Sequence, residues 1–133
     1  MEDFLTLVLK QIHDGTLIKS ADYSSRKCDV ALDARDDDPS FREAWSNLSD
    51  EVESRWKTSE FDETTRDQIE EIRRASFLTV SRATGQHEIA CYVSDDFELM
   101  VRGRLLGLSD PMLDWLWESY SRGEFPGSVL SGG

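Results

Sequence analysis

Apolar residues recur at three- and four-residue intervals along much of the chain, the spacing that places them on one face of an α-helix. The clearest such stripe consists of Phe41, Trp45, Leu48, Val52 and Trp56. It predicts a helix over about residues 39–57. Further stripes are formed by Phe4, Leu5, Val8 and Ile12, by Ile69, Ile72, Ser76 and Val80, and by Leu113, Leu116, Trp117 and Tyr120. They predict three more helices, the last over about residues 111–122.

Glycines mark the ends of the predicted helices. Each has a basic residue shortly before it, and the set is Gly15, Gly85, Gly107 and Gly123. Glycine adopts the left-handed conformation that closes a helix, and a cation in the last turn interacts favourably with the exposed carbonyl groups. The repeated pairing of these two signals predicts helix ends at all of these positions.

Helix starts are marked by acidic residues. Asp38-Pro39 and Asp110-Pro111 each offer a capping carboxylate followed by proline at the first helical position. Thr64 with Asp67 three residues later resembles a capping box in which Asp replaces Glu. This pattern predicts a third start at Thr64.

The segment from Gln86 to Gly107 allows two interpretations. Its apolar residues keep helical spacing, and Ser94 with the two aspartates after it could cap a new helix, which favours two helices with a break near Ser94. The alternative is a β-hairpin near residues 77–93 with its turn at Thr84-Gly85, because the flanking residues include good strand formers.

Length and composition indicate one folded domain. The chain has 133 residues and 38% hydrophobic residues, with enough aromatic side chains for an ordinary core. Residues 16–37 show no convincing period. We therefore expect a mainly α, single-domain bundle of about five helices over residues 1–126, with an α+β fold as the alternative. Residues 127–133 are expected to form a flexible tail.

The charge is strongly negative and is distributed over the whole chain. The formal net charge is −12, and the one dense acidic run extends from Asp33 to Asp38. An acidic protein repels polyanions, so we expect no binding to nucleic acid or to an anionic membrane. The same charge favours a basic protein partner, and Asp36 and Asp37 are candidate binding residues.

The compartment is expected to be the cytoplasm. The sequence has two cysteines far apart, which fits a reducing environment better than a disulfide scaffold. Acidic residues precede the apolar stretch at residues 4–9, where a signal peptide would have basic ones. No apolar run approaches the roughly 20 residues that a membrane-spanning helix needs.

Metal and cofactor signals are weak. His87 and Cys91 would share a helix face, but Cys28 and His13 provide no second pair at close spacing. Phosphate-binding glycine loops and a nucleophile elbow are also absent from the sequence. We therefore predict no bound metal and no cofactor.

One catalytic alternative rests on paired carboxylates. Helical phosphohydrolases place two acidic pairs on facing helices, and Glu70-Glu71 with Asp95-Asp96 could form such an arrangement. If they converged on one cavity, they could hold a divalent cation for hydrolysis.

Protein binding is the leading hypothesis. Trp115 lies off the apolar stripe of its helix and could be an exposed anchor for a partner, although burial on two sides would also explain it. With diffuse acidity and no catalytic motif, the sequence favours a bacterial, non-catalytic protein-binding module of inhibitor, immunity or accessory type. A metal-dependent hydrolase and a homo-oligomeric structural protein remain the alternatives.

Overall fold

The structure is a computed structural model that describes residues 3–18 and 25–126. Within these residues the chain forms six helices and no strand. In chain order they are α1 (Phe4–His13), α2 (Ser25–Asp36), α3 (Pro39–Lys57), α4 (Glu63–Thr84), α5 (His87–Leu105) and α6 (Pro111–Ser121). The predicted mainly α bundle is confirmed. The predicted tail at 127–133 lies outside the described residues.

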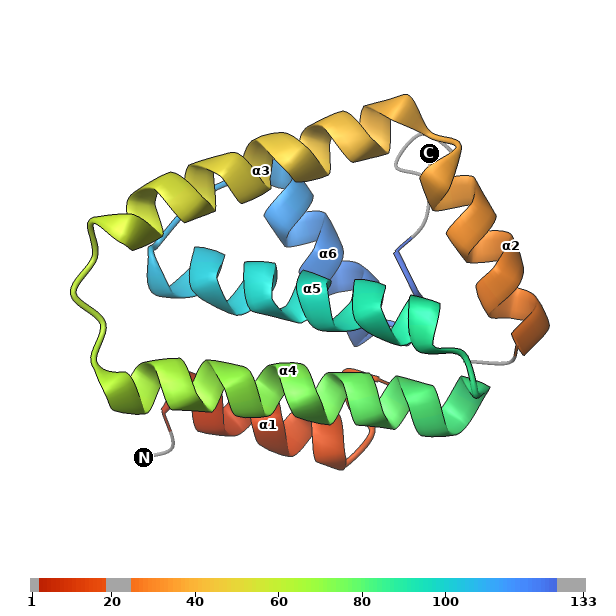
Figure 1. Ribbon diagram of the computed structural model, residues 1–133, viewed down its shortest axis with the longest axis horizontal. Coiled ribbons are helices and arrows are strands. Elements are labelled where there is room, and N and C mark those ends of the chain that lie inside the picture. The colour runs from red at the N-terminus through yellow and green to blue at the C-terminus, as the bar shows by residue number, and fades with distance from the viewer. Residues whose placement is uncertain (1–2, 19–24, 127–133) are drawn as a thin grey trace.

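The helices are arranged around α5 (Figure 1). α4 and α5 run antiparallel, joined by a short turn at Gly85, and α1 packs against α4, with Phe4 of α1 also contacting Trp117 of α6. α3 runs obliquely along the other side of α5, and α6 crosses behind them. α2 lies across one end of the bundle, next to the start of α3 and the start of α5. A charged or aromatic side chain at this end can therefore contact several helices at once.

Gly103 allows the close contact between α5 and α6. The residue is buried in α5, and a Cβ atom built on it would lie 2.9 Å from Cδ2 of Leu113. Leu113 itself is only 1% exposed. The absence of a side chain at Gly103 thus sets how closely the two helices pack.

The hairpin alternative is wrong. Residues 77–84 belong to α4 and residues 87–93 belong to α5. Ile89 and Val93 are fully buried on one face of α5, so their helical spacing, and not their strand propensity, decides the structure.

The predicted helix break near Ser94 is also wrong. The hydroxyl of Ser94 donates to the backbone oxygen of Cys91 inside a continuous α5. The two aspartates that follow point to other helices and do not cap a new one. α2 is an additional helix, formed within the region that shows no period in the sequence.

All four predicted helix ends agree with the structure, and so do two of the three predicted helix starts. The glycines at positions 15, 85, 107 and 123 all have positive φ, as predicted. Asp38 and Asp110 cap α3 and α6 as expected. The start at Thr64 is wrong, because Asp62 accepts a hydrogen bond from the backbone N–H of Thr65 at 2.8 Å and caps α4.

In the part of the chain that the structure describes, no helix combines the length and the apolar character needed to cross a membrane.

Candidate functional site

A buried ion pair fixes α2 to the rest of the bundle. Arg35 of α2 and Asp96 of α5 are 4% and 0% exposed. The guanidinium donates through Nη2 to Oδ1 of Asp96 at 2.6 Å and through Nη1 to Oδ2 at 2.8 Å. This two-point geometry is the strongest form of an arginine–carboxylate contact, so it holds α2 in one orientation.

Asp96 also accepts hydrogen bonds from two further helices. The indole Nε1–H of Trp45 in α3 donates to Oδ1 at 2.8 Å, and the hydroxyl of Tyr120 in α6 donates to Oδ2 at 2.7 Å. Each carboxylate oxygen therefore accepts two hydrogen bonds, which compensates for the loss of water around a buried charge. The side chains of α2, α3, α5 and α6 meet at this one carboxylate.

Arg35 stays charged in this environment. Burial lowers the pKa of its guanidinium, but the adjacent Asp96 carboxylate outweighs burial and raises the pKa above its usual value. Three aromatic rings also surround the guanidinium, with centroids 4.6 Å away for Phe41, 5.1 Å for Tyr92 and 5.2 Å for Phe125. The cation is thus held by both ionic and cation–π contacts.

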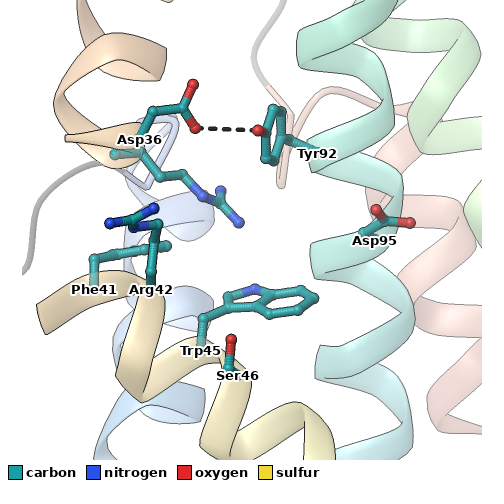
Figure 2. Close-up of a pocket in the computed structure, with 8 residues that line it drawn as sticks. Asp36, Phe41, Arg42, Trp45, Ser46, Tyr92 and Asp95 are labelled. Atoms are coloured by element: carbon teal, nitrogen blue, oxygen red, sulfur yellow. Dashed lines mark hydrogen bonds between the residues drawn. The ribbon is translucent and has the colours of Figure 1, made fainter. Parts of the chain in front are cut away.

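A pocket of about 270 Å³ opens beside this ion pair, between α2, α3 and α5 (Figure 2). It is lined by Arg35, Asp36, Phe41, Arg42, Trp45, Ser46, Tyr92 and Asp95. In Figure 2 the Trp45 ring extends from α3 toward α5 below the pocket, with Asp36 and Tyr92 above it. The pocket therefore combines aromatic surfaces with charged groups of both signs.

Asp36 is attached to one wall through Tyr92. The tyrosine hydroxyl donates to Oδ1 of Asp36 at 3.0 Å. Burial raises the pKa of Tyr92, and the hydrogen bond to Asp36 raises it further, so the phenol keeps its proton and remains a donor. This contact orients the Asp36 carboxylate at the edge of the pocket.

Asp95 lines the pocket from α5, and its carboxylate points away from the pocket toward α4 (Figure 2). Its Oδ1 accepts from Arg73 of α4 at 3.1 Å, and Arg73 also contacts Glu98 at 3.0 Å. Burial raises the pKa of the half-exposed Asp95, although the Arg73 charge opposes the rise. Asp95 is therefore part of a surface ion-pair group with Arg73 and Glu98.

A surface next to the pocket is acidic. Asp29, Asp33 and Asp36 have the spacing of one face of α2, Asp37 directly follows the helix, and all four are exposed; we refer to them as the acidic α2 face. The neighbouring Val30 is 66% exposed. Arg35, the cation between Asp29 and Asp38, is buried in its ion pair with Asp96.

The predicted binding residues Asp36, Asp37 and Trp115 lie in different surroundings in the structure. Asp36 lines the pocket, whereas Asp37 is exposed beside it. Trp115 is half-buried, and its ring packs edge-on against Phe41 with the centroids 5.7 Å apart. Trp115 therefore contributes to the core beneath α3 and is not an exposed anchor, because α6 is covered on more than one side.

The acidic pairs do not converge on one cavity. Asp96 is fully buried and paired with Arg35, while its neighbour Asp95 contacts Arg73. Glu70 and Glu71 are exposed on α4, and Glu70 approaches Arg73 at 3.9 Å. The convergence that the hydrolase alternative requires is therefore not found, because adjacent residues on a helix point in different directions.

Metal-ligating side chains do not gather elsewhere in the described residues. No group of three or more His, Cys, Asp or Glu there could hold a metal ion. His87 stacks on Phe77 at the start of α5, with the ring centroids 5.9 Å apart, and Cys91 is an exposed free thiol.

Sequence reasoning missed several residues of the pocket. Arg35 lies in the stretch without a period, so nothing there indicates that it is buried. Asp96 carries a usable signal, because it falls among Val93, Phe97 and Met100 on the apolar stripe of α5. A carboxylate at such a position requires a buried partner, although the sequence does not say which residue provides it.

Comparison with protein families gives a match over most of the chain. Residues 7–127 match the profile of the family described as Immunity protein PIM1. The chain belongs to this family. The match includes α2 to α6 and every residue of the pocket. A search of curated proteins found no match. Family membership indicates a protein that acts by binding a protein partner and not by catalysis.

Proposed function

We propose that this chain protects its cell by binding a basic toxic protein through the acidic α2 face and the adjoining pocket. Membership of an immunity-protein family supports the protein-binding role. The acidic α2 face supports the basic character of the partner. Exposed carboxylates attract a complementary surface and accelerate its association.

The arrangement of α2 suits this role. Arg35 holds the helix rigidly through Asp96, so its aspartates keep fixed positions relative to the pocket. A preorganised surface loses less conformational entropy when a partner binds. We place this interaction in the cytoplasm, and the exposed free thiol of Cys91 is compatible with that reducing compartment.

A triple variant of the acidic α2 face tests the proposal. In Asp33→Asn/Asp36→Asn/Asp37→Asn the shape is nearly conserved while three negative charges are removed. We expect the affinity-tagged variant to retain much less of the partner that the native chain captures from its host. We also expect it to protect co-expressing cells less well against that partner. The affinity of the native chain should fall as salt is added, because exposed charges are screened.

A second triple variant provides the matched control. Glu60→Gln/Asp67→Asn/Glu71→Gln removes the same charge from exposed positions in and before α4, away from α2. It should bind and protect like the native chain. Equal loss in both variants would show that only overall charge matters and would contradict the proposed surface.

Light scattering on the free chain separates binding to a partner from self-association. We expect a monomer whose mass does not change in the α2 variant. A homo-oligomer that the α2 variant dissociates would assign this face to contacts between copies of the chain.

A further inference from the structure

Another pocket lies at the end of the bundle opposite α2. Its volume is about 340 Å³, and it is lined by Trp56, Lys57, Arg66, Ile69, Glu70 and Arg102. These residues belong to the end of α3, the start of α4 and the end of α5, which meet far from α2 (Figure 1). We call it the basic pocket, because three cations and one carboxylate give its lining a formal charge of +2. The chain as a whole has a net charge of −12, so the sign is reversed here.

The charges of Lys57 and Arg66 are available to a ligand. Both side chains are exposed, and neither forms an ion pair with the residues that the structure describes. Glu70, the carboxylate of the lining, approaches Arg73 at 3.9 Å, and Arg73 does not line the pocket. One carboxylate that also faces another cation leaves positive charge on Lys57 and Arg66 uncompensated.

Arg102 adds a guanidinium that has more donors than acceptors around it. Its Nη1 lies 3.3 Å from Oε2 of Glu53 and 3.7 Å from Oε1 of Glu98, and neither carboxylate lines the basic pocket. Its Nε is buried without a hydrogen-bond partner, and its Nη2 forms no hydrogen bond with the described residues. A guanidinium has five N–H donors. The two glutamates therefore fix the group through one nitrogen and leave Nη2 for a further acceptor.

The aromatic ring beside these cations is already covered. Trp56 is 9% exposed and stacks on Phe61, with the ring centroids 4.5 Å apart. The guanidinium carbon of Arg102 lies 4.9 Å from the centroid of the same ring. Trp56 thus offers no open face to a flat ligand such as a nucleobase. The volume of about 340 Å³ is at the lower end of the range for ligand sites, roughly 300–1,000 Å³. A small anionic group fits these properties.

The basic pocket is connected to the pocket beside the acidic α2 face. Between them lies a smaller cavity of about 150 Å³, which shares Arg102 with the basic pocket and shares Trp45 and Asp95 with the pocket at α2. The three hollows follow α3, a helix of 19 residues and therefore about 28 Å long. A protein that covers them contacts negative charge at one end of α3 and positive charge at the other. Opposite charges at two ends fix the orientation of a complex.

We propose that the basic pocket receives a carboxylate of the protein partner, held by Lys57, Arg66 and Arg102. This assignment rests on the proposed function and names a group that the partner contributes at the other end of α3. An Asp or Glu side chain supplies such a group, and a carboxylate is a strong acceptor for guanidinium and ammonium donors. A polyanion is disfavoured, because the net charge of the chain repels it.

The probe is N-acetyl-glutamic acid α-amide, which carries one side-chain carboxylate. It is added to the native chain at millimolar concentrations and constant ionic strength, while the Nε–H resonance of Arg102 and the indole N–H resonance of Trp56 are recorded by NMR. We expect saturable shifts. The uncharged N-acetyl-glutamine amide should produce none. Equal binding of the two compounds, or no saturable shift with the acid, would overturn the assignment.

Four single variants locate the probe. Lys57→Gln and Arg66→Gln should each weaken its binding about two- to fivefold, as expected for an exposed ion pair. Glu70→Gln should strengthen binding, because it removes the carboxylate of the lining. Arg74→Gln is the matched control, since Arg74 is exposed on α4 and does not line the pocket. Equal weakening in Arg74→Gln would show that only net charge matters and would overturn the assignment.

Capture of the partner gives a test of opposite sign. Lys57→Gln/Arg66→Gln makes the chain more acidic, so its general attraction to a basic partner should rise. If the partner places a carboxylate in the basic pocket, this double variant instead retains less of the partner than the native chain. Arg74→Gln/Arg82→Gln makes the same charge change at exposed positions of α4 outside the pocket and should retain at least as much. Capture that rises equally in both double variants would contradict the site.

These outcomes separate this inference from the proposed function. If the triple α2 variant loses the partner and Lys57→Gln/Arg66→Gln does not, the acidic α2 face stands and the carboxylate site is wrong. If Lys57→Gln/Arg66→Gln loses the partner and the triple α2 variant does not, the carboxylate site stands and the acidic α2 face is wrong. Support for both requires both variants to lose the partner while their matched controls keep it.

Discussion

Arg35 and Asp96 form a buried bidentate ion pair across 61 positions of sequence. The pair joins α2, whose sequence has no clear apolar period, to the central helix α5. Trp45 and Tyr120 donate to the same carboxylate, so the orientation of α2 depends on polar contacts more than on an apolar stripe. The acidic α2 face and the pocket both depend on this attachment.

Removing one member of the pair should destabilise the fold strongly. Arg35→Met leaves the Asp96 carboxylate buried without its counter-ion, and the expected loss in the free energy of unfolding is about 3–5 kcal/mol. Urea denaturation followed by circular dichroism measures this loss. The control is Arg55→Gln, which breaks an exposed pair with Glu51 and should cost less than about 1 kcal/mol. Similar costs for the two variants would contradict a structural role of the buried pair.

The hydroxyls of Tyr120 and Tyr92 should contribute unequally to the free energy of unfolding. Tyr120→Phe removes a buried hydrogen bond to Asp96, and a hydrogen bond to a charged group contributes about 1.5–3 kcal/mol. Tyr92→Phe removes an exposed hydrogen bond to Asp36 and should cost less than about 1 kcal/mol. Denaturation midpoints of the two variants test the difference. A larger effect at Tyr92 would mean that the Asp36 contact, and not the Asp96 centre, secures α2.

Most of the helices could be predicted because their apolar stripes and end signals agree. The stripe from Phe41 to Trp56 and the cap at Asp38 both mark α3. α2 could not be predicted in this way, since among its described side chains, residues 29–36, the buried ones are Leu32 and a charged residue, Arg35. The continuous α5 was missed for a related reason: Asp96 resembles a capping residue in the sequence but is a buried ligand of Arg35.

The candidate site was harder to predict than the fold. Asp36 and Asp95 were singled out from the sequence for different reasons, binding and metal chemistry, and the structure places them in one pocket. Their meeting depends on how α2 crosses the end of α5, which no local pattern encodes. Trp115 was singled out as a possible exposed anchor but is half-buried in the structure. A tryptophan off the main stripe can still be covered when its helix packs on two sides.

Gly103 should be sensitive to a single added methyl group. In Gly103→Ala the new Cβ would lie 2.9 Å from Leu113 Cδ2, and overpacking of this kind costs about 1–3 kcal/mol. The higher helix propensity of alanine offsets up to about 1 kcal/mol of that cost. Thermal denaturation in a double-mutant cycle with Leu113→Ala measures the coupling. The glycine substitution should be neutral or stabilising in the Leu113→Ala background, and an unchanged cost there would exclude the steric explanation.

The cap of α4 should make stability depend on acid pH. Asp62 accepts the hydrogen bond of the Thr65 backbone N–H, and this contact lowers the pKa of the Asp62 carboxyl below 3.8 in the folded chain. A carboxyl with a lowered folded-state pKa stabilises the fold above its unfolded-state pKa, and this contribution is lost as the pH falls through the folded-state value. Asp62→Ala should therefore lower the Tm near pH 7, and the difference from the native chain should shrink as the pH falls below 3.8. Thr64→Ala is the control, because Thr64 is exposed in the first turn and caps nothing. If Thr64→Ala lowered the Tm as much as Asp62→Ala does, Asp62 would not be the specific N-cap of α4.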